Sequence, residues 1–241
     1  MNGMGDVRRV ALITGGTGAL GTAVTRAFLA QGSAVVATYR AEPEAERVRT
    51  ALGGAGRLDL QRVDVTSTAE VATLVEQTLA RHSQIDYLIN LVGAWAGGLP
   101  VWETGDAEWE RMLAVNLRST FVCCRAVLPH LLERGFGRIV NVASRTALQP
   151  SPGAAAYAVS KMGVITLTET LALELRQRDA DVTANCVVPS VIDTEANRRA
   201  MPGARFEHWV RPEQLAAIIL WLTSADAAPI NGAAIPVYGR A

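Results

Sequence analysis

Several features are scarce in this 241-residue sequence, and each scarcity argues against a class of protein. Acidic and basic residues are equal in number, 23 of each, so no net charge favours nucleic acid or an acidic membrane surface as a partner. The opening stretch, MNGMGDVRR, lacks the apolar segment of a signal peptide, and no uninterrupted apolar run is long enough to span a bilayer. We therefore expect a cytoplasmic protein that binds a small molecule rather than nucleic acid or a membrane.

Cysteine and histidine are also rare, with three of each. Two of the cysteines are adjacent and none has the spacing of a metal ligand, so we expect buried thiols in a reducing compartment. The histidines are scattered, and we interpret them as surface or helix-end residues. The residues concerned are Cys123, Cys124, Cys186, His82, His130 and His208. The sequence therefore predicts no metal site.

Apolar runs and helical patterns alternate along the chain, and 49% of its residues are hydrophobic, enough for a sizeable core. Strands are predicted at about 7–14, 33–38, 57–63, 85–91, 135–144, 181–188 and 233–237. Helices are predicted at about 22–31, 42–52 (ended by Gly53 and Gly54), 66–82, 106–132, 155–177 and 212–224. This alternation, with no linker, predicts a single α/β domain over residues 1–241, with a doubly wound, parallel seven-stranded sheet and helices on both faces.

A glycine-rich turn, Gly15 to Gly21, separates the first predicted strand from the first predicted helix. Glycines let a backbone approach a pyrophosphate closely, and the helix N-terminus then offers N–H groups and the positive end of the helix dipole. Such a turn is a weak signal alone. Its place after a strand and before a helix supports a dinucleotide site.

The second predicted strand ends at Thr38 and is followed by Tyr39 and Arg40. An acidic residue here would bond the ribose hydroxyls of NAD(H) and repel a 2′-phosphate. Arg40 can instead pair with a 2′-phosphate and stack on adenine, so we favour NADP(H) over NAD(H). The alternative is that Arg40 is a solvated loop charge.

The stretch SRTALQPSPGAAAYAVSK holds Ser144, Tyr157 and Lys161. If Tyr157 begins a helix, Lys161 lies one turn later on the same face, and its ammonium should lower the tyrosine pKa from the ordinary value of about 10. Such a tyrosine can exchange a proton with a substrate oxygen, which Ser144, at the end of a strand, can also hold. A tyrosine and a lysine at this spacing are common by chance, and alone they are more often surface residues.

Two further features bear on the site. Asn116 lies in an otherwise apolar helical stretch, and it either ties the helix to a strand or holds a water molecule in the site. The connection at about 189–210 is too long for a plain turn, so we predict that it is a lid over the substrate.

Over essentially its whole length, the chain resembles the short-chain dehydrogenase/reductase family, which has a Rossmann-type fold. The family's glycine motif is similar to TGGTGALG, Thr14 to Gly21, with Ala19 in place of the middle glycine. Its Asn-Asn-Ala-Gly motif is similar to the stretch from Asn90 to Gly93, and its Pro-Gly motif to Pro189-Ser190. Its catalytic tetrad falls on Asn116, Ser144, Tyr157 and Lys161.

The resemblance implies which residues bind the cofactor. Asp64 would contact adenine, and Thr194 the nicotinamide. The full implied set is Gly15, Thr17, Gly18, Ala19, Leu20, Gly21, Tyr39, Arg40, Asp64, Val65, Asn90, Leu91, Val92, Gly93, Tyr157, Lys161, Pro189, Val191, Ile192 and Thr194.

The resemblance also implies a mechanism and an assembly. Hydride would pass between the nicotinamide and a carbonyl carbon while Tyr157 gives a proton to the substrate oxygen and Ser144 binds that oxygen. Lys161 would lower the tyrosine pKa and bind the nicotinamide ribose, and Asn116 would hold a relay water. A homotetramer or homodimer would form through the helices at 106–132 and 155–177.

The substrate is left open among several alternatives. We expect a carbonyl reductase acting on a ketone or a 3-oxoacyl thioester. Segments 93–98 and 193–209 are similar to loops of the family's dihydropteridine reductases, and Trp95 and Trp209 would then flank a flat ring, with Arg145 a third candidate contact. Arg198, Arg199 and Arg205 either grip a carboxylate or phosphate or are solvated. A non-catalytic dinucleotide sensor is the remaining alternative, which the complete tetrad disfavours.

Overall fold

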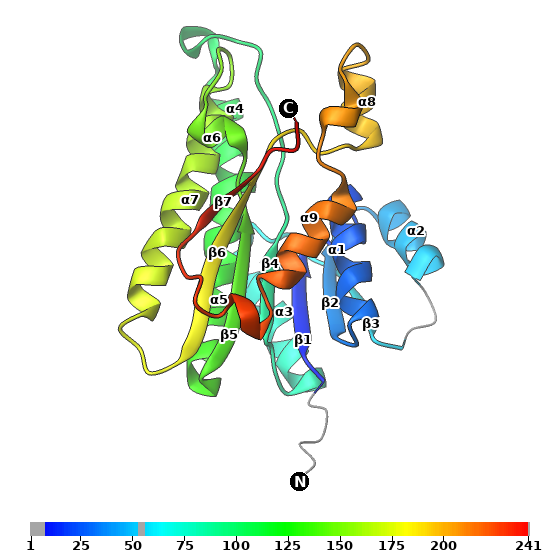
Figure 1. Cartoon of the computed structure of the whole chain (residues 1–241), viewed down its shortest axis with the longest axis vertical. Helices are drawn as coiled ribbons and strands as arrows, with labels where there is room; N and C mark the ends of the chain where they lie inside the picture. The colour runs from blue at the N-terminus through cyan, green and yellow to red at the C-terminus, as the bar shows by residue number, and fades with distance from the viewer. Residues whose placement is uncertain (1–7, 53–55, 241) are drawn as a thin grey trace.

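A computed structural model describes residues 8–52 and 56–240 and places seven strands in one sheet (Figure 1). The strands are β1 (Val10–Thr14), β2 (Ala34–Tyr39), β3 (Leu58–Arg62), β4 (Tyr87–Asn90), β5 (Phe136–Val142), β6 (Asp181–Pro189) and β7 (Ala234–Val237). Their order is β3-β2-β1-β4-β5-β6-β7, and every neighbouring pair is parallel. The predicted seven-stranded Rossmann-type sheet is therefore confirmed, although Val7, assigned to the first strand, lies outside the described residues.

Helices connect the strands, and their positions follow the predicted pattern closely. They are α1 (Ala19–Ala30), α2 (Glu42–Leu52), α3 (Thr68–His82), α4 (Asp106–Met112), α5 (Ser119–Arg134), α6 (Arg145–Leu148), α7 (Ala155–Leu175), α8 (Glu195–Ala200) and α9 (Pro212–Trp221). A π-helical turn, Leu113–Arg118, joins α4 to α5. The predicted end of α2 at Gly53 and Gly54 lies outside the described residues.

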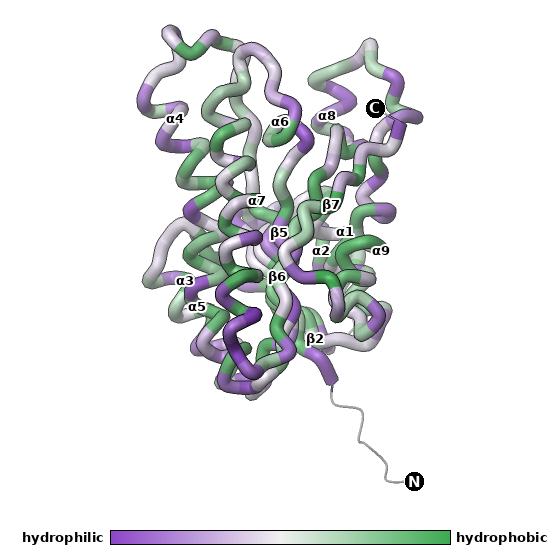
Figure 2. The backbone as a smooth tube through the Cα atoms, turned by 60° about the vertical axis from the view of Figure 1, so that its left-hand side comes forward, coloured by the Kyte–Doolittle hydropathy of each residue, from purple (hydrophilic) through white to green (hydrophobic). Residues whose placement is uncertain are grey.

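Helices cover both faces of the sheet because alternate strand residues point to opposite faces. Ile13 of β1 packs in one apolar cluster with Phe28 of α1 and Leu215 of α9. Its neighbour Leu12 packs in a second cluster with Leu74 of α3. Figure 2 shows α1 and α9 on one side of the strands and α3 and α5 on the other. Each fully buried Leu, Ile or Phe in these layers stabilises the fold by about 1.5–3 kcal/mol relative to an exposed one.

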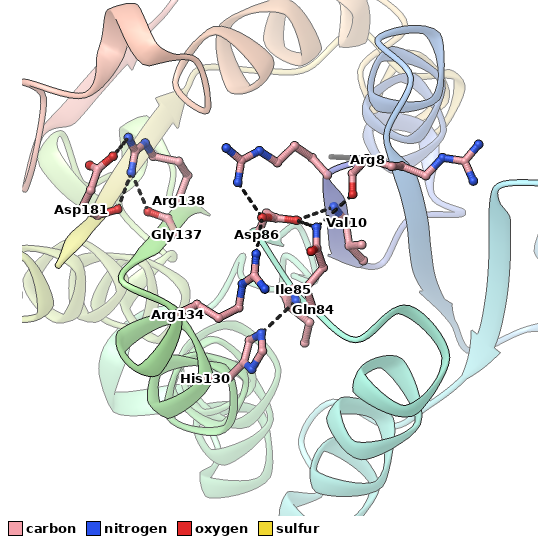
Figure 3. A network of polar contacts seen from close by, with 11 residues as sticks. Arg8, Val10, Gln84, Ile85, Asp86, His130, Arg134, Gly137, Arg138 and Asp181 are labelled. Carbon is pink, nitrogen blue, oxygen red and sulfur yellow. Dashed lines mark hydrogen bonds and ion pairs between the residues drawn. The ribbon is translucent and has the colours of Figure 1, made fainter. Parts of the chain in front are cut away.

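A polar network ties the amino ends of the central strands together (Figure 3). The Asp86 carboxylate is fully buried and accepts hydrogen bonds from the Val10 N–H at 2.7 Å and the Arg9 guanidinium at 2.8 Å. The Arg134 guanidinium lies 3.6 Å from the same carboxylate. A buried carboxylate requires such partners, so Asp86 fixes β1 beside β4 at the edge of the sheet opposite the predicted site.

His130, interpreted as a surface or helix-end residue, belongs to the same end of the molecule and lies near the C-terminal end of α5. Its ring is partly buried, and Nε2 accepts a hydrogen bond from the Ile85 N–H at 3.1 Å. Desolvation, followed by the charge of Arg134, holds the pKa of His130 below its ordinary value. The neutral ring is therefore a structural acceptor between α5 and the start of β4.

The stretch Asp106–Arg134 is, by length and composition alone, able to cross a membrane. Its Val122, Val127 and Leu131 are at most 1% exposed and pack against the sheet with residues of α3 and β5. This packing is that of a core helix. Large apolar side chains remain exposed on α4, α5 and α7, namely Trp109, Phe121, Val159, Met162 and Leu173. Assembly through these helices stays a prediction.

Candidate active site

The glycine-rich turn lies where β1 passes into α1, and its glycines are required by close approach. Gly15 has a φ of +64°, in the left-handed region that favours glycine. A Cβ on Gly16 would lie 2.6 Å from Ala37 Cβ, and one on Gly21 would collide with the Gly15 carbonyl. Gly18, by contrast, has an extended conformation as the N-cap of α1. Ala19 is then the first helical residue, a position that needs no glycine.

A cavity of about 300 Å³ opens at the carboxyl ends of β1 to β4, beside this turn. Ten of the predicted cofactor residues line it: Gly15, Thr17, Gly18, Tyr39, Arg40, Asp64, Val65, Leu91, Val92 and Gly93. Five further lining residues escaped the sequence analysis: Thr38, Glu44, Val63, Thr66 and Val115. Thr38 and Thr66 flank predicted residues along the chain, so strand-end position alone would have found them.

Charges of both signs face this cavity. The exposed Arg40 guanidinium lies 3.5 Å from Asp64 Oδ2. Thr66 donates to Asp64 Oδ1 from its hydroxyl at 2.7 Å and from its N–H at 3.0 Å, and these bonds, with the Arg40 charge, lower the pKa of Asp64. Asp64 is thus a fixed anion. Glu44 also faces the cavity, where its Oε2 accepts a hydrogen bond from the Thr17 hydroxyl at 3.2 Å.

Asn116 holds three segments of the site together from within the π-helical turn. Its side chain is fully buried, accepts from the Ala94 N–H at 2.9 Å, and donates to the Ala94 carbonyl and to Ser160 Oγ, both at 3.0 Å. These bonds tie the helix to the loop after β4 and to α7. The side chain therefore has a structural role, with a loop and a helix as its partners rather than a strand, and its water-holding role stays a prediction.

Gly93 sits between Asn116 and Lys161. A Cβ on Gly93 would lie 2.9 Å from Lys161 Nζ and 3.0 Å from Asn116 Oδ1. A side chain at this position would therefore crowd the Lys161 ammonium and the Asn116 amide. Asn90, at the end of β4, donates to Asn141 Oδ1 at 2.9 Å, and its own Oδ1 is buried with no hydrogen-bond partner among the described residues.

Ser144 and Tyr157 meet at the end of β5. Ser144 is the N-cap of α6, and its Oγ accepts from the Thr146 N–H at 3.3 Å, which leaves its own proton free to donate. The Ser144 hydroxyl acts on Tyr157, in the first turn of α7, where it opposes the rise in the pKa of the phenol that burial causes. The structure therefore brings these two predicted catalytic residues together.

Lys161 lies one turn beyond Tyr157 but faces another partner. Its Nζ donates to the Val142 carbonyl at 2.9 Å, and burial lowers the pKa of Lys161 to about 8. Burial raises the pKa of Tyr157 despite the opposing hydrogen bond from Ser144. The expected drop in the tyrosine pKa is therefore wrong for this structure, because desolvation of the phenol outweighs the opposing interaction with Ser144.

The segment after β6 forms the far side of the site. Thr194 is the N-cap of α8, and its hydroxyl accepts from the Asn197 N–H at 3.1 Å. The segment is closed at its base by hydrogen bonds between Asp193 N and the Val210 carbonyl and between Val210 N and the Val191 carbonyl. Pro189, Val191, Ile192 and Thr194 do not line the cavity. Their predicted contact with the cofactor, like the lid, stays a prediction.

The candidate substrate residues are placed very differently from one another. Trp95 is 64% exposed, whereas Trp209 is 8% exposed and packs against Phe206, with the rings tilted and their centres 4.9 Å apart. The Arg145 guanidinium lies 5.6 Å from the centre of the Tyr238 ring. The three arginines of the segment each pair with an acid of the same segment, Arg198 with Asp193, Arg199 with Glu195 and Arg205 with Glu207. A contact between these arginines and a ligand stays an open alternative.

Among residues 8–52 and 56–240, no group of three histidine, cysteine or acidic side chains is placed to hold a metal ion. The three cysteines are buried, as predicted.

Comparison with known proteins decides the family. A family model for short chain dehydrogenases matches residues 9–204, most of the chain. The chain belongs to the short chain dehydrogenase family. It is 30% identical over 240 residues to a 3-oxoacyl-(acyl-carrier-protein) reductase of Thermotoga maritima, with 96% of each chain covered.

Two further proteins are similar to this chain over nearly its whole length. It is 33% identical to a D-threitol dehydrogenase of Mycolicibacterium smegmatis, covering 96% of this chain and 92% of that one. The crystal structure of gox2181 superposes with a TM-score of 0.89 at 27% identity, covering 96% and 95% of the two chains. The curated relatives carry the names of enzymes for quite different substrates, so the family does not by itself fix the substrate of this chain.

The pKa of Lys161 can be measured without interference, because Lys161 is the only lysine in the sequence. Protein labelled with ζ-¹⁵N lysine should give one side-chain resonance, which we expect to titrate with a midpoint of about 8. Between that pH and about 10.4, the ordinary lysine value, the folded protein holds fewer protons than the unfolded chain, so the free energy of unfolding should rise with pH. The same sample in denaturant is the control. A folded-state midpoint at the denatured value would contradict this assignment.

Proposed function

We propose that the protein is an NADP(H)-dependent oxidoreductase that interconverts a carbonyl and an alcohol, with a ketone or a 3-oxoacyl thioester as substrate. The observation that carries the proposal is the joining of Ser144 to Tyr157 at the end of β5, with Lys161 one helical turn away and Asn116 anchoring the neighbouring loop. A sensor that only bound dinucleotide would not require this set.

The residues present fit a nicotinamide dinucleotide. Gly15 and Gly18 offer backbone without side chains at the cavity, and a Cβ on Gly18 would meet only the Gly15 carbonyl, at 3.6 Å. Arg40 and Asp64, which line the cavity, would contact the adenosine, and the absence of a side chain at Gly93 leaves room beside Lys161. The dinucleotide supplies the hydride equivalent when it is bound.

The chain's own residues then handle the proton. Because burial raises the pKa of Tyr157, the phenol is protonated at neutral pH and suited to give its proton to a developing alkoxide. The Ser144 hydroxyl can donate a hydrogen bond to the same substrate oxygen. The Lys161 ammonium would stabilise the phenolate that Tyr157 leaves after it gives up its proton. A relay water held by Asn116 would restore the tyrosine proton through Lys161.

NADPH oxidation against a panel of carbonyl compounds tests the proposed substrate class. The panel holds a 3-oxoacyl thioester, several plain and aromatic ketones, and a quinonoid dihydropterin. We expect turnover of a ketone or thioester, because the tyrosine and serine together address a carbonyl oxygen. Turnover of the pterin alone would favour the dihydropteridine alternative. NADPH binding without turnover of any compound would contradict the proposal and favour the sensor.

Cofactor choice is tested at Arg40, the cation at the adenosine end of the cavity. Replacing it in the variant Arg40→Asp should shift the ratio of NADPH to NADH dissociation constants toward NADH by roughly tenfold to a hundredfold, because a charge-assisted bond to the 2′-phosphate is lost. Arg47→Asp, on the exposed side of α2, is the matched control for charge. An unchanged ratio in Arg40→Asp would refute Arg40 as the selector.

A further inference from the structure

Glu44 stands out among the residues that line the cavity, because nothing in the proposed chemistry accounts for it. It lies in the first turn of α2, partly buried, and its Oε2 accepts the Thr17 hydroxyl at 3.2 Å. This bond joins α2 to the glycine-rich turn. Glu44 lines the same cavity as Arg40 and Tyr39.

The other acids of α2 are engaged elsewhere. Arg49 pairs with Glu42 at 2.8 Å and with Glu46 at 2.7 Å, and Glu42 also accepts the Tyr39 hydroxyl at 2.8 Å. No cation of the described chain lies within ion-pair distance of Glu44. Its charge is therefore not neutralised by a neighbour, and its remaining acceptor sites are free for a ligand.

We propose that Glu44 is a cofactor-specificity residue that acts against Arg40, by accepting a hydrogen bond from a hydroxyl of the adenosine ribose and disfavouring a 2′-phosphate. This inference rests on the proposed function, since it concerns the same dinucleotide.

Elementary electrostatics gives the direction of the effect. The ribose of NAD(H) carries a 2′-hydroxyl that can donate to a carboxylate. A 2′-phosphate carries a charge of about −1.5 to −2 at neutral pH, presents chiefly acceptor oxygens, and is repelled by a carboxylate. Arg40 attracts the same phosphate. Attraction of the 2′-phosphate by Arg40 and its repulsion by Glu44 then partly cancel. The preference for NADP(H) is therefore smaller than it would be with Arg40 alone.

The test compares dissociation constants of NADPH and NADH, measured from the fluorescence of each reduced dinucleotide, in the unmodified protein and in Glu44→Gln. Removing the charge should tighten NADPH binding about fivefold, by loss of repulsion, and weaken NADH binding about threefold. The shift should shrink at high salt, because this end of the cavity is open to solvent. Glu46→Gln, on the same helix but outside the cavity, should keep the original ratio.

Each outcome separates this inference from the proposed function. If Glu44→Gln weakened the binding of NADPH and NADH equally, Glu44 would only support the glycine-rich turn through Thr17. If both dissociation constants stayed the same, Glu44 would have no role in cofactor choice. Either result would overturn the inference while the proposed function stands. Binding of neither dinucleotide to the unmodified protein would contradict both. Glu44→Ala should move the ratio in the same direction, which guards against a folding defect in a single variant.

Discussion

The site depends on one constraint of the sheet, namely that all its strands run in the same direction and end at one edge. The strand order reverses beside β1, so the connections that follow β1 and β4 diverge, although the strands themselves stay paired as far as Thr14 and Asn90, and the cavity lies beside these connections. Gly15, Gly93 and Ser144 follow three different strands and still reach one region. Asp86 secures the opposite edge, where it holds the start of β1 against β4.

Burial, rather than pairing of charges, sets the protonation of the two titrating groups in this structure. Tyr157 keeps its proton because its phenol is desolvated, and Lys161 holds its proton weakly for the same reason. The pKa of Tyr157 lies above its ordinary value, so the phenol releases its proton reluctantly. The pKa of Lys161 is about 8, so its ammonium loses its proton not far above neutral pH. The negative charge of a substrate oxygen or of a bound dinucleotide would favour the lysine ammonium, and proton transfer from Tyr157 would then be coupled to ligand binding.

The sequence predicted the strands, the glycine-rich turn and the catalytic set, because hydrophobic periodicity and local motifs carry these features directly. It missed α6 because a single helical turn of four residues, Arg145–Leu148, is too short to show a period. The π-helical turn around Asn116 was also invisible, since a change from four- to five-residue hydrogen bonding leaves the residue pattern unaltered.

Other features depend on tertiary structure alone. Glu44 lines the cavity and bonds Thr17 of the glycine-rich turn, and the buried Trp209 ring packs against Phe206. The direction of the tyrosine pKa was predicted wrongly because sequence shows the neighbouring lysine but not the depth of burial. The ion pairs within the segment after β6 could not be predicted from the sequence either, because they depend on how that segment folds.

The central claim is that Tyr157 is the proton donor of a reaction for which the rest of the site binds and orients the ligands. The most direct measurement compares turnover and NADPH affinity in Tyr157→Phe with those of the unmodified protein, using a carbonyl substrate that the protein reduces. Tyr87→Phe, which removes a buried hydroxyl at the far end of β4, is the matched control. The account predicts that turnover falls by about a hundredfold or more while the NADPH dissociation constant stays within about twofold. Turnover equal to that of the unmodified protein would contradict it.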